Sequence, residues 1–262
     1  MQELNTKDEI WIQKHFSSKE SKKYIPTGYR GLDNLIDGFY GGCLYVIGAR
    51  PGTGKTTLVL NFLVNLKYKK QLIFTTEIEA KQFLEKLASR LFGIDHKEIR
   101  QNLDAVREPI LGQIEKFKEY DIHIVDEYKP NTKDVRQIIE TIKPDIVYFD
   151  YFQNVFINPF VSQRYQEYTR KTEEFFNMAR DYNIPIVLTS QLKRAPEDRK
   201  DRRPEMADMK ETGKLEESAH VAILLSKTSN GILVDVCKNR NGSVGEFELS
   251  GLWNINRLED II

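Results

Sequence analysis

The stretch from Cys43 to Leu60 constrains this chain more than any other. An apolar run over 44–47 ends in a glycine-rich loop, and an apolar pattern at helical spacing follows at once. A strand, such a loop and a helix in that order form a cradle, because backbone N–H groups and the positive end of the helix bind an anion there. The loop reads Gly-Ala-Arg-Pro-Gly-Thr-Gly-Lys-Thr-Thr over 48–57, which predicts a phosphate-binding loop.

Ten consecutive residues of this loop are predicted to bind nucleotide: Gly48, Ala49, Arg50, Pro51, Gly52, Thr53, Gly54, Lys55, Thr56 and Thr57. The Lys55 ammonium is predicted to contact the β/γ-phosphates, and the Thr56 hydroxyl to ligate Mg²⁺. The strict pattern carries glycine where this chain has Ala49, and Gly48 stands one place earlier. Strand and helix still flank the loop correctly, so the motif predicts a site for a nucleotide with Mg²⁺.

The composition is that of one globular domain. The chain has 262 residues, of which 40% are hydrophobic and 30% charged. No apolar run approaches the roughly 18 residues of a membrane span, and the polar, acidic start resembles neither a secretory signal nor a transit peptide. Cys43 and Cys237 lie in apolar runs, which suits a reducing compartment. We therefore expect a cytoplasmic protein with no membrane partner.

Beyond the phosphate loop, strand-like runs alternate with helical patterns. The predicted strands cover 71–76, 121–125, 145–150 and 185–190, and the predicted helices cover 80–92, 105–118, 132–142 and 163–182. This alternation predicts an α/β fold with a mostly parallel sheet flanked by helices. Asn-Gly turns join later runs, which predicts antiparallel strands at the end of the sheet: 221–225, 232–237 and 247–249.

We expect one large domain over residues 24–262, preceded by a short arm over residues 1–23. The arm is polar but carries apolar residues such as Trp11. A docking helix and a frayed terminus are both consistent with this pattern.

The ends of the predicted strands supply groups that nucleotide hydrolysis requires. One strand is apolar and ends in Asp150, which is predicted to hold the metal at the carboxyl edge of the sheet. Glu77 follows another and is predicted to orient and deprotonate the attacking water. Asp126 and Glu127 compete for that role, but their strand need not lie next to the nucleotide. Gln191 is predicted to contact the γ-phosphate or its water, with an ordinary loop amide as the alternative.

Cations outside the loop are also candidates. Lys238 and Arg240 follow the predicted strand over 232–237. They could contact a phosphate bound by another subunit, as an arginine finger does, or form an ordinary hairpin tip. The segment 193–203 carries six basic and three acidic residues, so it is a solvated loop or a DNA contact through Lys193 and Arg194. The net charge is zero, so a nucleic acid would have to meet such a local basic surface. The histidines lack metal-site spacing.

With these residues assembled, the chain resembles the ATPase motor domain of DnaB-type replicative helicases, a branch of the RecA-like fold, over about residues 24–256. That family's phosphate loop also carries alanine at the position of Ala49. The most discriminating likeness is the stretch from Arg203 to His220, which is similar to the family's DNA-binding loop and short helix. The stretches that carry the resemblance are 25–33, 48–56, Glu77, 150–153, 190–192, 203–220 and 238–242.

The resemblance implies a RecA-like P-loop NTPase that binds ATP and Mg²⁺ between the subunits of a ring, a hexamer. It implies that hydrolysis drives movement along single-stranded DNA, with Lys210, Glu211 and Gly213 beside the DNA backbone. Lys238 and Arg240 would act on the ATP of the adjacent subunit. Primase and other replication proteins are further expected partners.

The chain departs from the family's pattern at its start, where that family has an N-terminal helical domain and this chain has residues 1–23. A docking helix around Trp11 would then contact a neighbouring motor, and a frayed terminus stays the alternative. Two alternatives stay open: a RadA- or recombinase-like ATPase that remodels DNA, and an accessory factor that uses nucleotide as a switch. The set Glu77, Asp150 and Gln191 argues against the switch, because a pure binder does not need all three.

Overall fold

One sheet organises the part of the chain that the computed structural model describes, residues 24–126, 130–193, 203–209 and 213–261. Six of its strands run parallel: β3 (Leu44–Ala49), β4 (Lys70–Thr75), β5 (Asp121–Val125), β6 (Ile146–Asp150), β7 (Ile186–Gln191) and β8 (Val221–Lys227). Three more are antiparallel: β9 (Gly231–Asn239), β10 (Gly245–Leu252) and β11 (Arg257–Asp260).

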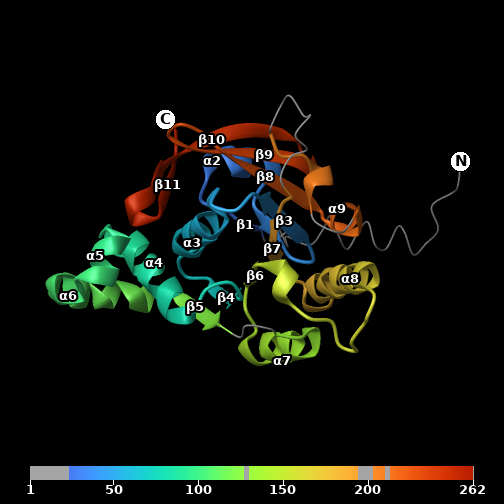
Figure 1. Ribbon diagram of the computed structural model, residues 1–262, viewed down its shortest axis with the longest axis horizontal. Helices are drawn as coiled ribbons and strands as arrows, with labels where there is room; N and C mark the ends of the chain where they lie inside the picture. Colours follow the sequence, from blue (N-terminus) through green and yellow to red (C-terminus); the bar gives the residue numbers. More distant parts are fainter. Residues whose placement is uncertain (1–23, 127–129, 194–202, 210–212, 262) are drawn as a thin grey trace, which may run out of the picture.

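The strand order is β11-β10-β9-β8-β3-β7-β6-β4-β5, with the phosphate-loop strand β3 in the middle (Figure 1). The predicted α/β fold with a mostly parallel sheet and antiparallel C-terminal strands is confirmed. A separate two-stranded sheet pairs β1 (Tyr24–Ile25) with β2 (Phe39–Tyr40). The predicted arm, residues 1–23, lies outside the described residues.

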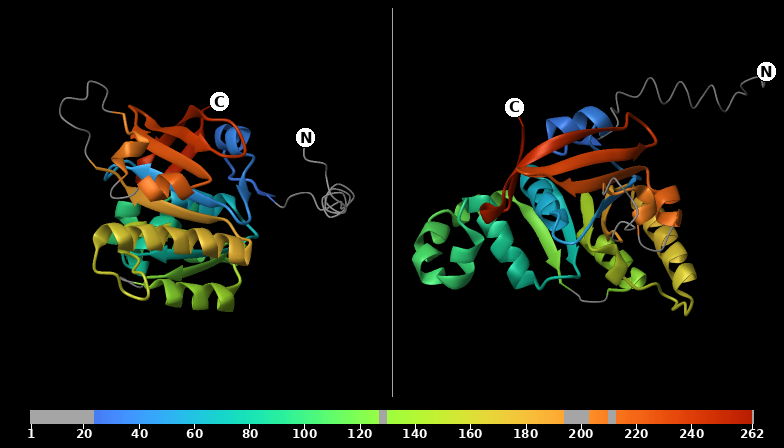
Figure 2. Two further views of the ribbon diagram at one scale, coloured as in Figure 1. Left: turned by 90° about the vertical axis from the view of Figure 1, so that its right-hand side faces the viewer. Right: turned by 45° about the horizontal axis from the view of Figure 1, so that its top comes forward.

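Helices cover both faces of this sheet (Figure 1). On one face pack α2 (Arg30–Ile36), α3 (Lys55–Asn65) and α4 (Ala80–Phe92), and on the other α7 (Thr132–Ile142), α8 (Arg164–Tyr182) and α9 (Gly213–Ser218). Strand β3 is buried on both sides, because Tyr45 and Ile47 join the first core and Leu44 and Val46 the second. Figure 2 shows α5 (His96–Gln101) and α6 (Leu103–Leu111) as a lobe at the outside of the molecule.

The single helix predicted over 105–118 is wrong. The chain forms α6, which ends at Leu111, and then a 3₁₀ helix, η1 (Ile114–Glu119). Glycine has low helix propensity, and Gly112 ends α6 with its N–H on the carbonyls of Glu108 and Ile110. Apolar spacing continued across this break and suggested one helix.

Helix α5 and strand β11 are among the elements that were not predicted from the sequence. Helix α5 is short and begins where the Asp95 side chain accepts the Lys97 N–H at 2.8 Å. Strand β11 carries one buried apolar side chain, Leu258, and depends on its pairing with β10. Among the described helices, none combines the length and apolarity that crossing a bilayer requires.

Candidate nucleotide site and its surroundings

Parallel strands bring the candidate catalytic residues to one edge of the sheet. The last residue of β4 lies opposite Asp150 on β6, and Ala49 on β3 lies opposite Gln191 on β7. The Thr76 N–H donates to the Asp150 carbonyl at 2.8 Å, directly before Glu77. The carboxyl edge of the sheet therefore collects the phosphate loop, two carboxylates and one amide, at the place where such folds bind ligands.

The phosphate loop leads from β3 into the first turn of α3. Gly54 precedes the helix with a φ of 115°, a conformation that glycine adopts readily. A Cβ at this position would lie 3.2 Å from the Trp253 ring, so space as well as backbone favours glycine. The first N–H groups of a helix have no partner within it, so the start of α3 can bind an anion.

Lys55 lies just inside this loop and is 8% exposed. Its Nζ donates to the Ala49 carbonyl at 3.5 Å. Burial lowers the pKa of Lys55, and the negative charges of Asp150 and Glu77 oppose that shift. A bound phosphate would oppose it further, so the position suits a lysine that neutralises phosphate charge.

Asp150 is almost fully buried, at 1% exposure, and two hydroxyl groups hold its carboxylate. Thr56 Oγ1 donates to Oδ2 at 2.6 Å, and Thr189 Oγ1 donates to Oδ1 at 2.6 Å. Mg²⁺ prefers oxygen ligands and commonly uses one or two protein ligands together with phosphate and water. The Thr56 hydroxyl and the Asp150 carboxylate fit that ligand set, because they already lie in contact beside the phosphate loop.

Glu77 lies beyond the end of β4, on the same side as the metal candidates. Partial burial raises the pKa of Glu77, and the nearby Asp150 raises it further, while Lys55 and Lys86 lower it. A carboxylate with a raised pKa is a better proton acceptor, which suits a general base.

The competing candidate Asp126 accepts the Ala80 N–H at 3.3 Å, at the start of α4. Its strand, β5, is the edge strand, with β4 and β6 between it and β7. Glu127 lies outside the described residues. The geometry favours Glu77 for contact with a nucleotide on the phosphate loop.

Gln191 ends β7 beside the phosphate loop, and its backbone N–H donates to Gln153 Oε1 at 3.5 Å. The Gln153 amide in turn donates to Ser190 Oγ at 2.9 Å. Gln153 belongs to the 3₁₀ helix η2 (Phe152–Asn154), which directly follows the strand of Asp150. These bonds join the ends of β6 and β7, so Gln191 is held close to the strand that ends in Asp150.

Lys238 and Arg240 do not join this site within one chain. Strand β9 runs antiparallel to β8, with Lys238 opposite Ala222, near the start of β8. The phosphate loop follows the other end of the parallel strands. From Val221 to Leu225 the separation along the strand is about 13 Å.

The side chains of these two cations bind α9 instead. Lys238 Nζ donates to the carbonyls of Glu216 and Glu217 at 2.6 and 2.9 Å, and the Arg240 guanidinium donates to Glu217 as well. Burial lowers the pKa of Lys238, and the positive charge of Arg240 lowers it further. Cations at the carboxyl end of a helix also complement its dipole.

The DNA-binding candidates are only partly described. Lys193 follows β7 and its N–H donates to the Asp208 carbonyl at 2.8 Å. Gly213 begins α9, which packs on α8 and is tied to it by the Lys214–Glu173 ion pair at 3.7 Å. Three further candidates lie outside the described residues: Arg194, Lys210 and Glu211.

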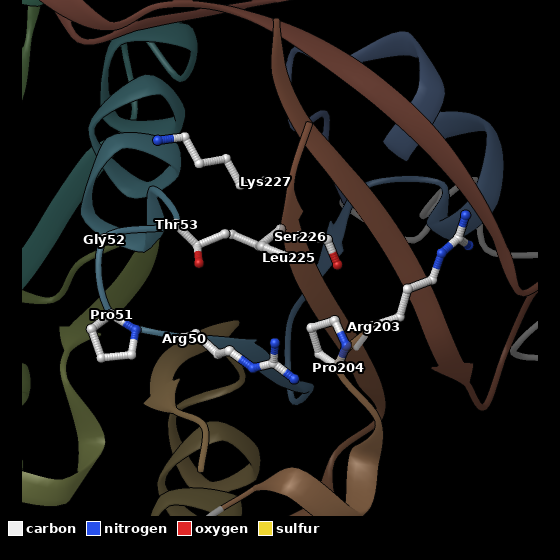
Figure 3. Close-up of a pocket in the computed structure, with 9 residues that line it drawn as sticks. All are labelled: Arg50, Pro51, Gly52, Thr53, Arg203, Pro204, Leu225, Ser226 and Lys227. Carbon is white, nitrogen blue, oxygen red and sulfur yellow. The ribbon is translucent and has the colours of Figure 1, made fainter. Parts of the chain in front are cut away.

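A cavity of about 590 Å³ opens beside the phosphate loop (Figure 3). Three cations line it, one from each of three segments: Arg50 from the loop, Arg203 from the segment after β7, and Lys227 from the end of β8. None of the described residues that line it is acidic, but the Arg203 guanidinium also pairs with Glu246 at 3.0 Å. Arg50 and Lys227 therefore contribute most to the positive charge that suits the cavity to an anionic ligand. The remaining lining residues are Pro51, Gly52, Thr53, Pro204, Leu225 and Ser226.

Sequence reasoning missed two threonines that build the site. Thr189 orients Asp150, and Thr76 Oγ1 lies 3.1 Å from the Tyr151 carbonyl and accepts the Tyr151 N–H at 3.0 Å. Both stand near the carboxyl end of a strand with an apolar run, so polar side chains at strand ends were the available signal. Their partner could not be read from that pattern.

Comparison with known proteins identifies the family. The protein family described as "DnaB-like helicase C terminal domain" matches this chain over residues 24–260. The replicative DNA helicase DnaB of Mycoplasma pneumoniae is 29% identical over 244 residues, which cover 87% of this chain and 52% of that protein. The DnaB of Treponema pallidum is 30% identical over 254 residues, covering 91% and 56%. This chain thus spans about half the length of these relatives.

Solved structures share the fold. One of them, described as an ATPase domain, superposes with a TM-score of 0.88 at 22% identity, over 99% of this chain and all of that domain. A DnaB-like replicative helicase, studied with its interactions with primase, gives the same score and identity over 69% of its length. The expected resemblance is confirmed, and the chain belongs to the family of DnaB-like helicase C-terminal domains.

Proposed function

We propose that residues 24–262 form an ATP-driven motor that moves along single-stranded DNA as part of a replicative helicase. In this proposal the phosphate loop holds ATP, with Lys55 on its phosphates. Thr56 and Asp150 hold Mg²⁺, which neutralises phosphate charge when bound. Glu77 accepts the proton of the attacking water, and Gln191 contacts the γ-phosphate. The family and the named relatives favour this activity over a recombinase-like one.

The observation that carries the proposal is the separation of the two halves of the site. Glu77, Asp150 and Lys55 meet at the carboxyl edge of the sheet, whereas Lys238 and Arg240 lie near the start of β8. Hydrolysis requires added positive charge near the γ-phosphate, and a finger supplied in trans can provide it. A second copy of the chain can therefore complete the site, which supports assembly into a ring, a hexamer.

The proposed partners follow from this arrangement. Single-stranded DNA would lie against the segment after β7 and the start of α9, through Lys193, Arg194, Lys210, Glu211 and Gly213. Primase is a further proposed partner, because a structural relative was solved with its interactions with primase. We also propose that this activity is cytoplasmic.

Steady-state ATP hydrolysis, with and without single-stranded DNA, tests the activity in the parent chain and in Glu77→Gln. We expect DNA to raise the rate of the parent and the variant to lose turnover while still binding ATP. General-base removal typically costs about 10²–10⁴ in rate. A parent chain that binds ATP but shows no DNA-stimulated hydrolysis would contradict the motor.

Mixing two inactive variants tests the site between subunits. Lys55→Ala lacks a working phosphate loop but keeps its finger, and Arg240→Ala keeps the loop but lacks the finger. Each alone should be inactive, and their mixture should recover part of the parent rate because one kind of interface is then complete. If the mixture stays as inactive as each variant, the finger does not act in trans.

A further inference from the structure

Arg50 belongs to the phosphate loop, but its guanidinium extends away from the loop toward Pro204 (Figure 3). The side chain is 27% exposed, and its Nε and Nη2 atoms are buried. Neither atom has a hydrogen-bond partner among the described residues. Buried hydrogen-bond donors normally have an acceptor, so we expect an acceptor for the Arg50 guanidinium close to this position.

A carboxylate lies close by, that of Asp208, with Oδ2 at 4.0 Å from Arg50 Nη2 and a side chain that is 5% exposed. Asp208 ends the 3₁₀ helix η3 (Met206–Asp208), and its Oδ2 accepts the Glu205 N–H at 3.0 Å. A charge-assisted hydrogen bond measures about 2.7–2.9 Å, so an approach of about 1 Å would form one. Glu205 and Asp208 cap the turn on each other, which holds the carboxylate in place.

The backbone connects the same two places by a second route. The Leu192 N–H donates to the Ala49 carbonyl at 3.0 Å, and the Lys193 N–H donates to the Asp208 carbonyl at 2.8 Å. Leu192 also forms an antiparallel bridge with Met209. The residues after Gln191 therefore lie between the phosphate loop and η3.

We propose that Arg50 is a positioning residue that ties the base of the DNA-binding segment to the phosphate loop through Asp208. This inference rests on the proposed function, because it assigns a route by which bound ATP changes affinity for DNA. When nucleotide orders the phosphate loop, Arg50 closes on Asp208 and sets η3, which directly precedes the DNA-binding candidates Lys210 and Glu211. The distance to be closed is the 4.0 Å between Arg50 Nη2 and Asp208 Oδ2.

The test uses three single variants of the full chain and the double variant Arg50→Lys/Asp208→Asn. Asp208→Asn removes the charge but keeps an oxygen for the Glu205 N–H, and Arg50→Lys keeps the charge but loses the guanidinium. Glu205→Gln is the matched control, because it alters the same turn and leaves the Arg50–Asp208 pair intact. Fluorescence anisotropy of a labelled oligothymidylate, with Mg²⁺ and with or without a non-hydrolysable ATP analogue, measures how nucleotide changes DNA affinity. Urea midpoints report folding.

We expect Asp208→Asn to reduce the nucleotide-dependent change in DNA affinity by about fivefold or more, with its affinity for the ATP analogue unchanged. Arg50→Lys should reduce it too, and the double variant should lose no more than the larger single effect. Glu205→Gln should behave as the parent.

Retention of the full change in folded Asp208→Asn would overturn the inference and leave the motor intact. An equal loss in Glu205→Gln would also overturn it, since the turn and not the pair would then matter. If the parent binds DNA equally with and without nucleotide, the coupling in the proposed function fails, and this inference fails with it.

Discussion

Removing the Thr189 hydroxyl tests how the buried Asp150 carboxylate is held. Thr189 is 0% and Asp150 1% exposed, and their hydrogen bond measures 2.6 Å. Thr189→Val keeps the shape of the side chain and takes one donor from a carboxylate that water cannot reach. A hydrogen bond to a charged group contributes about 1.5–3 kcal/mol, so we expect the free energy of unfolding to fall by about 2 kcal/mol.

The assay is urea denaturation followed by tryptophan fluorescence, with EDTA and without nucleotide so that no cation compensates. Thr172→Val is the matched control, because Thr172 is equally buried and its hydroxyl donates to the neutral Tyr168 carbonyl at 2.8 Å. The control should lose about 1 kcal/mol, as expected for a bond between neutral groups. A loss in Thr189→Val equal to or below that of the control would refute the argument.

The same variant has a functional consequence. With one oxygen unheld, the Asp150 carboxylate can rotate away from Thr56, the other metal candidate. Loss of a group that orients a metal ligand typically costs about 10–100-fold in metal affinity or activity. We therefore expect half-maximal ATP turnover in Thr189→Val to require a Mg²⁺ concentration that is higher by about tenfold or more. Parent-like Mg²⁺ dependence would show that Thr56 alone orients the carboxylate.

Three further changes have defined outcomes. Burial, and then nearby cations, lower the pKa of His220 from 6.5, so the unfolded chain binds more protons than the folded chain. The free energy of unfolding should therefore fall as the pH drops below about 6.5. His220→Gln should weaken this pH dependence, which urea titrations at several pH values measure. Protonation would also take the acceptor from the Leu44 N–H, now 3.0 Å from His220 Nδ1. Gly231→Ala should destabilise the fold by about 3 kcal/mol or more in thermal unfolding, because its Cβ would lie 1.8 Å from the Leu249 carbonyl oxygen; a near-parental melting temperature would contradict this. Gln71→Leu should lower the free energy of unfolding by about 2 kcal/mol in urea denaturation, because the buried Gln71 amide donates to two carbonyls at the end of α3, at 2.9 and 3.1 Å. A change below about 0.5 kcal/mol would contradict this prediction.

Local sequence was enough to predict the phosphate loop and most elements around it. The strand–loop–helix order at 44–65 depends on neighbouring residues, because glycine conformations, apolar periodicity and a helix start are local properties. Prediction failed at Gly112, where α6 ends although the apolar spacing of a helix continues beyond it. It also failed for β11, which depends on pairing with β10. The resemblance to the motor family rested on such local motifs and held over the whole described domain.

Tertiary structure decided which of these motifs meet. Strand order places β7 between β3 and β6, which brings Thr189 to Asp150 across 39 residues of sequence. The antiparallel return of β9 places Lys238 and Arg240 near the start of β8 and onto α9, away from their own phosphate loop. The sequence by itself determined which chemical groups are present and the secondary structure on either side of each one. Only strand pairing, a contact between distant segments, decided which groups share a site and which lie apart from it.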